Sequence, residues 1–437
     1  MDQKFDVIII GAGVIGCATA FELVKRGYKT LNVDKLPASG YGSTSNSLAI
    51  VRAHYSTWDG VAMAYEGFFY WNDWASYLGV KDERGLVKYM KTGTIIFKSS
   101  EDKHYAKTLQ YYREIGVEFE EWDLATLKKR MPIYAHDLYG RVTRPDDDEH
   151  FWDKTGKLIE GAVFTPGSGY VNDPQLAAHN LQTAAEAHQG KFLFGQEIVE
   201  IRQAHGKIQG VRLASGEQID APVVVNITGP HSSIVNRMAG VDQDMKIKTR
   251  ALRQEAHQVP SPPGFDFERE GCHTSDSDNA VSFRPETGNT IMIGSEDPEC
   301  DPRVWIKNPD DFNRNLSDSQ WRAQTYRLAR RIPTLEFPSR PRGVVDLYDV
   351  SDDWIPVYDK SSLQGYYMAV GSSGNQFKSA PVAGHCMAEL IDACENGHDH
   401  DLNPLQVQCV YTKLTLNMGF YSRNREVNQD SSFSVNG

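Results

Sequence analysis

The first strand, turn and helix of the chain constrain its fold more than any other feature. The run Gly11-Ala-Gly13-Val-Ile-Gly16 follows an apolar strand and opens an amphipathic helix, and Asp34 closes the next apolar strand. Such glycines let the strand turn sharply, admit a pyrophosphate against the backbone and let the helix pack on the sheet, while the acid takes ribose hydroxyls. Free N–H groups at the helix N-terminus favour the phosphates. The pattern predicts a dinucleotide-binding site; the alternative is a glycine-rich turn in an unrelated α/β protein.

Length and composition narrow the class of protein. A chain of 437 residues exceeds what one core usually supports, so two domains are expected. A formal net charge of −12 without a basic block argues against nucleic acid and anionic membranes as partners. No apolar run approaches the roughly 20 residues of a membrane span, and six scattered cysteines without C-x-x-C spacing indicate free thiols. Since the first strand begins almost at Met1, no signal peptide is expected, and a cytoplasmic enzyme is predicted.

Several later segments predict further parts of the sheet structure. The glycine- and serine-rich loop of residues 37–46 permits close approach to a ligand. Short strands at 197–213 predict a β-meander, and the apolar strand at 221–229 reads as a buried central strand that resumes the first sheet. Strands within 280–294, joined by a turn, predict the sheet of a second domain. A second strand, glycine turn and helix occupies residues 365–394.

Five motifs, in chain order, add to the N-terminal fingerprint. They are Gly42-Ser-Thr-Ser-Asn-Ser-Leu-Ala-Ile-Val-Arg52-Ala-His-Tyr55, Pro230 after Val-Val-Asn-Ile-Thr-Gly229, Phe283-Arg-Pro-Glu-Thr-Gly288, Leu347-Tyr-Asp-Val-Ser-Asp-Asp-Trp-Ile-Pro356 and Gly371-x-Ser-Gly374-x-x-Phe-Lys378. Over about residues 4–395 the chain resembles the FAD-dependent amine and amino-acid oxidoreductases of the D-amino-acid oxidase superfamily, which include sarcosine oxidase, glycine oxidase and dimethylglycine dehydrogenase.

The resemblance implies FAD, bound in an extended form. It also implies an α/β fold in which a doubly wound, Rossmann-type FAD domain is interleaved with an α+β substrate domain that carries an antiparallel sheet. The expected FAD domain is discontinuous, at 1–80, 150–240 and 341–400, with the substrate domain at 81–149 and 241–340 and a C-terminal tail at 401–437. The implied cofactor-binding residues are Gly11, Gly13, Ile15, Gly16, Asp34, Lys35, Ser43, Thr44, Ser45, Leu48, Ala49, Ile198, Gly229, Gly374, Asn375, Gln376 and Lys378.

Three residues match positions where the family contacts its substrate. Arg52 and Lys378 fall where the family places two cations that bind the substrate carboxylate, and Tyr348 matches an active-site tyrosine of the sarcosine oxidase branch. Without the resemblance, Arg52 reads as a surface or helix-pairing arginine and Tyr348 as a core tyrosine. Lys378 reads as a solvated lysine beside a helix N-terminus, where the helix dipole disfavours a cation unless an anion binds nearby.

The chain departs from the family at four positions near the flavin. Asp346 stands where a relative carries a cysteine attached to the flavin, so non-covalent FAD is expected. Met292 replaces a lysine that speeds reaction with oxygen, and a thioether cannot stabilise developing superoxide as a cation does. Ser45 and Ala49 replace a histidine and an arginine. These departures leave two electron acceptors open: O₂, as in an oxidase, or another molecule, as in a dehydrogenase.

The implied reaction is oxidation of the C–N bond of a small amino acid or N-alkyl amino acid such as sarcosine. Two alternatives stay open: FAD-dependent oxidation of a 2-hydroxy acid, and a flavin-binding subunit of a hetero-oligomeric dehydrogenase. His54, His257 and His273 are candidate acid/base residues, although a lone histidine is more often structural. No motif predicts a metal site. The expected partner is a small-molecule substrate, and assembly into an oligomer is possible.

Overall fold

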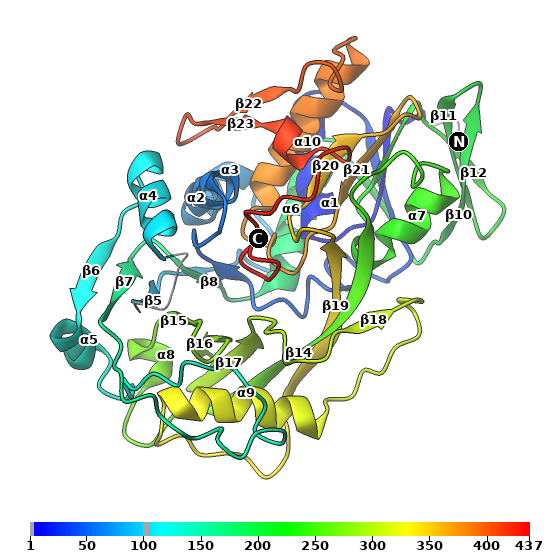
Figure 1. Cartoon of the computed structure of the whole chain (residues 1–437). Coiled ribbons are helices and arrows are strands. Elements are labelled where there is room, and N and C mark those ends of the chain that lie inside the picture. Colours follow the sequence, from blue (N-terminus) through cyan, green and yellow to red (C-terminus); the bar gives the residue numbers. More distant parts are fainter. Residues whose placement is uncertain (1–3, 99–104) are drawn as a thin grey trace.

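The computed structural model describes residues 4–98 and 105–437, and two large sheets dominate this part of the chain (Figure 1). The first sheet has six strands. They are parallel except for the edge strand β20, which runs antiparallel to β21. Their order across the sheet is β20 (Val357–Lys360), β21 (Tyr366–Val370), β13 (Val223–Asn226), β1 (Val7–Ile10), β2 (Thr30–Asp34) and β9 (Lys191–Phe194).

Both faces of this sheet are covered, which explains why its central strands are continuous apolar runs. Along β1, Val7 and Ile9 pack into one core cluster and Ile8 and Ile10 into another. Helices α1 (Val14–Lys25), α6 (Pro174–Ala187) and α10 (Ala380–Glu395) contribute to the first cluster. The meander of β10 (Ile198–Ala204), β11 (Lys207–Leu213) and β12 (Gln218–Asp220), together with α7 (Ser232–Met238), covers the other face.

The second sheet has nine strands and is antiparallel apart from the β15–β5 pair. Helix α9 (Asp318–Arg331) crosses its outer face (Figure 1). Phe283, Ile291 and Ile293 of the sheet belong to the same core cluster as Leu328 of the helix. The strands are β18 (Val304–Ile306), β14 (Thr249–Pro260), β17 (Thr290–Ser295), β16 (Val281–Glu286), β15 (His273–Asp276), β5 (Thr94–Lys98), β7 (Gly161–Thr165) and β6 (Glu120–Asp123), with β19 (Gly343–Ser351) also paired to β14.

Most of the remaining elements of the described chain are short. Besides the meander, short strands form one three-stranded and one two-stranded sheet, and the latter belongs to the C-terminal segment. The remaining elements are β3 (Ile50–Val51), β8 (Gly169–Val171), β4 (Tyr89–Met90), β22 (Gln406–Gln408), β23 (Thr415–Asn417), α2 (Trp58–Asn72), α3 (Trp74–Leu78), α4 (Tyr105–Ile115), α5 (Leu124–Arg130), α8 (Phe267–Glu270), η1 (Gly229–His231) and η2 (Met418–Tyr421).

The α/β prediction is confirmed, including the meander and the central position of β13 beside β1. Strands β7 and β19 lie in the nine-stranded sheet although both fall within ranges expected for the FAD domain. The two-domain boundaries stay a prediction. None of the helices within 4–98 and 105–437 is long and apolar enough to cross a membrane.

Candidate active site

A cavity of about 540 Å³ lies between the two sheets and joins distant parts of the chain. One end is lined by the fingerprint turn after β1 and by Asp34 at the end of β2. The other is lined by Arg52, Tyr348 and Lys378. All the residues predicted to bind the cofactor or substrate line it, except Ser45 and Met292.

The fingerprint turn is shaped by very close backbone packing. Gly11 has a φ of +112°, and a Cβ atom there would lie 2.3 Å from the carbonyl oxygen of Ile227 on the neighbouring segment. Side chains rarely adopt this backbone conformation, so glycine is required for the turn. Asp34 accepts hydrogen bonds from the backbone N–H groups of Ala12 (2.8 Å) and Leu36 (2.9 Å). Burial nevertheless raises the pKa of Asp34.

Helix α1 begins beside this turn without a side-chain cap at Gly13. The N–H of Val14 donates to Oγ1 of the neighbouring Thr44 at 3.1 Å. Thr44 also lines the cavity, as do Gly13 and Ile15. An uncapped helix N-terminus facing a cavity is a ready anion-binding site. The residues present therefore fit the pyrophosphate of a dinucleotide.

The loop before β3 is fixed by two residues of the nine-stranded sheet. Asp346 accepts hydrogen bonds from Oγ of Ser43 (3.2 Å) and Nδ2 of Asn46 (2.6 Å). The buried Arg284 donates from Nε to the carbonyl of Leu48 at 2.7 Å. Ser45 turns back on its own loop, where its hydroxyl bonds the carbonyl of Gly42 and does not reach the cavity.

A polar group missed by the sequence reasoning lies at the Asp34 end of the cavity. Asp310 forms an ion pair with Lys35 (2.5 Å) and contacts Nε2 of His231 (3.0 Å). All three residues line the cavity. His231 follows the Gly229-Pro230 motif, which was a usable signal, but nothing in the sequence connects Asp310 to Lys35 across 275 positions.

Arg52 and Lys378 lie together at the opposite end of the cavity. Arg52 is 6 % exposed, and its guanidinium donates to the carbonyl groups of His54 and Val435. Lys378 is 3 % exposed and donates from Nζ to the hydroxyl of Tyr55 (2.9 Å) and the carbonyl of Asn375 (2.6 Å). Burial and the nearby charge of Arg52 hold the pKa of Lys378 well below the usual lysine range.

The tyrosine predicted at the site packs directly on the glycine turn before α10. Gly374 has a φ of +67°, and a Cβ atom there would lie 2.3 Å from Cε2 of Tyr348. The ring of Tyr348 therefore needs glycine at this position. Burial raises the pKa of Tyr348 above its ordinary value, so its hydroxyl stays protonated at neutral pH.

Met292 and the three candidate histidines lie outside the set of described residues that line the cavity. Met292 lies on β17 opposite Arg284, and it is not among the cavity-lining residues that the structure describes. His257 contacts Gln324 (2.9 Å) and Glu255 (3.2 Å), and its ring packs against Trp321 of α9, on the outer side of the sheet. His273 is fully buried and contacts Thr94 through Nδ1 at 3.0 Å. Neither His273 nor His54 lines the cavity.

Comparisons with known proteins agree with a cavity that fits a dinucleotide. A family model described as FAD dependent oxidoreductase matches residues 6–390. A glycine oxidase of Geobacillus kaustophilus is 24% identical over 91% of this chain and 96% of its own length. The sarcosine oxidase subunit beta of Rhodobacter capsulatus is 22% identical, with 89% and 85% covered. In fold, the crystal structure of L-proline dehydrogenase from P. horikoshii matches with a TM-score of 0.74 at 20% identity, over 97% of this chain and 98% of that one.

Proposed function

Because this chain belongs to the family of FAD-dependent oxidoreductases, we propose that it oxidises the C–N bond of a small amino acid or N-alkyl amino acid, with sarcosine as the type of substrate. One observation carries this proposal: two buried basic side chains, Arg52 and Lys378, line the same cavity as the fingerprint turn. A buried positive charge needs an anionic partner, and a substrate carboxylate supplies one for both. The similarity to glycine and sarcosine oxidases supports the same substrate class.

From the cavity residues we infer a place for each part of FAD. The turn at Gly11 and the start of α1 would hold the pyrophosphate, and Asp34 the adenosine ribose. The loop that Asp346 fixes and the turn at Gly374 would hold the flavin. FAD supplies the electron acceptor for the reaction, taking a hydride from the carbon next to the substrate amine.

The protein's own side chains bind and orient the substrate. The guanidinium of Arg52 has five N–H donors. Two of them donate to main-chain carbonyls among the described residues, which leaves others to bind a carboxylate. The ammonium of Lys378 adds a second charge. Held in this way, the substrate presents its C–N bond in one orientation, and orientation contributes much of the rate enhancement.

No acid/base residue is required if the amine binds in its neutral form. The nitrogen lone pair forms the C=N bond as the hydride leaves the adjacent carbon, and water then hydrolyses the imine to a carbonyl compound and an amine. The positive charges of the buried Arg52 and of the carboxylate-bound Lys378 favour a neutral substrate amine, because two neighbouring positive charges disfavour a third.

A panel of candidate substrates mixed with the purified protein under argon tests this proposal. We expect glycine, sarcosine or another N-methyl amino acid to bleach the visible flavin absorbance, whereas amines that lack the carboxylate leave it unchanged at the same concentration. Bleaching by 2-hydroxy acids alone would replace the proposal with the alternative chemistry on the same scaffold.

The similarity to a sarcosine oxidase subunit beta favours a second candidate, a flavin-binding subunit of a larger enzyme. In that case the chain binds FAD but bleaches only after a partner subunit is added. Measuring the mass of the native protein and repeating the anaerobic panel with the isolated chain separates the two candidates. Bleaching by the isolated chain rules out the need for a partner in the reductive step.

A further inference from the structure

The last turn of the chain, residues 431–437, forms part of the cavity wall. Val435 lines the cavity together with Arg52, Tyr348 and Lys378. Its side chain is 9 % exposed and belongs to a small apolar cluster with Leu252, Val350 and Trp354, against which Tyr348 packs. In Figure 1 the C-terminal end lies near the middle of the molecule, between the helices of the six-stranded sheet and the nine-stranded sheet.

The turn is joined directly to the residue that we assign to the substrate carboxylate. Nη2 of Arg52 donates to the carbonyl of Val435 at 2.9 Å, across 383 positions of sequence. The backbone N–H of Ser56 donates to the carbonyl of Asn436 at 3.0 Å, so the segment after Arg52 is also tied to the turn. Val435 is therefore held within reach of whatever group the Arg52 guanidinium binds.

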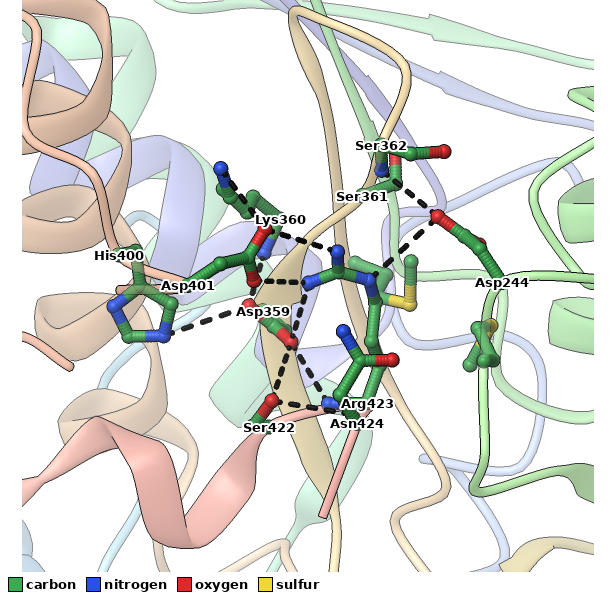
Figure 2. Close-up of polar contacts among 12 residues, drawn as sticks. Asp244, Asp359, Lys360, Ser361, Ser362, His400, Asp401, Ser422, Arg423 and Asn424 are labelled. Carbon is green, nitrogen blue, oxygen red and sulfur yellow. Dashed lines mark hydrogen bonds and ion pairs between the residues drawn. The ribbon is translucent and has the colours of Figure 1, made fainter. Parts of the chain in front are cut away.

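Buried ion pairs fix the segment that leads to the turn. In Figure 2 Arg423 bridges Asp359 (3.0 Å) on β20 and Asp401 (2.8 Å), and the hydroxyl of Ser422 also donates to Asp359. Arg425 then forms two hydrogen bonds with the buried carboxylate of Asp353, at 2.9 and 2.8 Å.

The turn itself is held by hydrogen bonds between serine hydroxyls and main-chain groups. The hydroxyl of Ser431 donates to the carbonyl of Asp353 at 2.6 Å, and the N–H of Ser432 donates to Oγ of Ser56 at 3.2 Å. Because anchors lie both before and within residues 431–437, the turn is a fixed wall and not a loose end.

We propose that Val435 is a specificity-determining residue, whose side chain limits the size of the group that the substrate carries on the carbon next to its carboxylate. This inference rests on the proposed function, since it takes Arg52 as the carboxylate ligand. Val435 then lies beside that carbon, and a branched side chain held in an apolar cluster leaves little room there. The substrate class narrows to amino acids with no side chain or a very small one.

Binding of simple carboxylates to the FAD-loaded protein tests, without any turnover, whether Val435 limits the size of the bound group. Acetate has only hydrogen on the carbon next to the carboxylate, and isobutyrate has two methyl groups there. Their dissociation constants are read from the change that each causes in the flavin spectrum, for the wild type, Val435→Ala and Val435→Phe. Val427→Ala and Val427→Phe are matched controls, because Val427 is an exposed valine of the same segment and does not line the cavity.

We expect the wild type to prefer acetate. Val435→Ala should tighten isobutyrate relative to acetate by about fourfold or more, the value of one newly buried methyl group. Val435→Phe should weaken isobutyrate further, and the Val427 variants should match the wild type. If both Val435 variants keep the wild-type ratio of the acetate and isobutyrate dissociation constants, Val435 does not limit the size of the substrate. A wild type that binds no carboxylate at all overturns the proposed function and the wall with it, so the two failures are distinct.

Discussion

Lys378 is a buried basic side chain whose hydrogen bonds go to neutral oxygens, those of Tyr55 and Asn375. Burial disfavours the charged form of such a lysine, and its pKa is correspondingly lowered. A bound carboxylate reverses this effect, because an opposite charge close by favours the ammonium. We therefore expect substrate binding and protonation of Lys378 to be coupled, which would give the site a characteristic pH dependence.

Carboxylate binding should weaken as the pH rises. The free site takes up a proton on Lys378 when acetate binds, so the dissociation constant for acetate increases once the pH passes the lowered pKa of Lys378. This change should occur below the ordinary titration range of lysine. Lys378→Arg stays protonated throughout and should bind acetate with little pH dependence. Flavin difference spectra across a pH series measure both proteins; a wild type as flat as the Lys378→Arg variant contradicts the assignment.

Met292 gives the second prediction for a single residue. If it takes the place of an oxygen-activating lysine, the reduced protein should react slowly with O₂, since no cation there offsets the first electron transferred. An artificial acceptor should then react faster than oxygen. Met292→Lys should accelerate reoxidation, provided that the new lysine stays protonated. Stopped-flow mixing of reduced protein with aerated buffer measures the rate of reoxidation. If the wild type is reoxidised as fast as turnover requires, another cation activates oxygen, and Lys378 is the first candidate.

At the scale of elements, the sequence predicted those helices and strands whose formation depends on neighbouring residues in the chain. The β1–α1–β2 unit and the buried strand β13 could be recognised because an apolar strand and a glycine turn are contiguous in sequence. The assignment of β7 and β19 to the nine-stranded sheet could not, because pairing partners far apart in the chain decide which sheet a strand joins. The C-terminal segment showed no regular apolar period, because it consists of short elements held both by scattered buried side chains such as Leu416 and Met418 and by ion pairs.

Those ion pairs predict a large effect on stability. Arg423→Ala leaves the carboxylate of Asp359 buried with its main cationic partner removed, and breaking a buried pair costs about 3–5 kcal/mol. The control is Lys246→Ala, because Lys246 pairs with Glu426 of the same segment on the surface, where a pair contributes about 1 kcal/mol or less. Denaturant unfolding of both FAD-saturated variants measures the difference, and similar losses for the two would contradict the buried clamp.

At the scale of the whole molecule, the site exists only where the two sheets meet. The fingerprint residues were found because their spacing is local. Asp310 and Val435 were missed because each reaches the cavity from a distant part of the chain, and Arg284 was missed because it acts on the cavity wall through Leu48. Arg284 lay within a recognised motif, yet its hydrogen bond to Leu48 spans 236 positions. Without the resemblance, the sequence predicted the dinucleotide end of the cavity better than the substrate end.

The same arrangement predicts how FAD is held. The resemblance implies that Asp346 stands where a relative has a flavin-linked cysteine, and Asp346 accepts hydrogen bonds from Ser43 and Asn46. We therefore expect acid precipitation to release the flavin into the supernatant. The FAD-free protein should unfold at a lower temperature than the loaded one, because a ligand that binds only the folded state stabilises it. A pellet that stays yellow after washing in denaturant contradicts non-covalent binding.

The central claim is that Arg52 and Lys378 bind the carboxylate of an amino acid that is oxidised at its C–N bond. Anaerobic stopped-flow reduction of the flavin, in the wild type, Arg52→Ala and Lys378→Ala, tests it most directly, with the amino acid that bleaches the wild type fastest. Each alanine variant should lose about 2–4 kcal/mol of substrate binding, which raises the half-saturating concentration roughly 30-fold or more. If both variants reduce at wild-type rates and saturate at wild-type concentrations, the two cations do not bind the substrate.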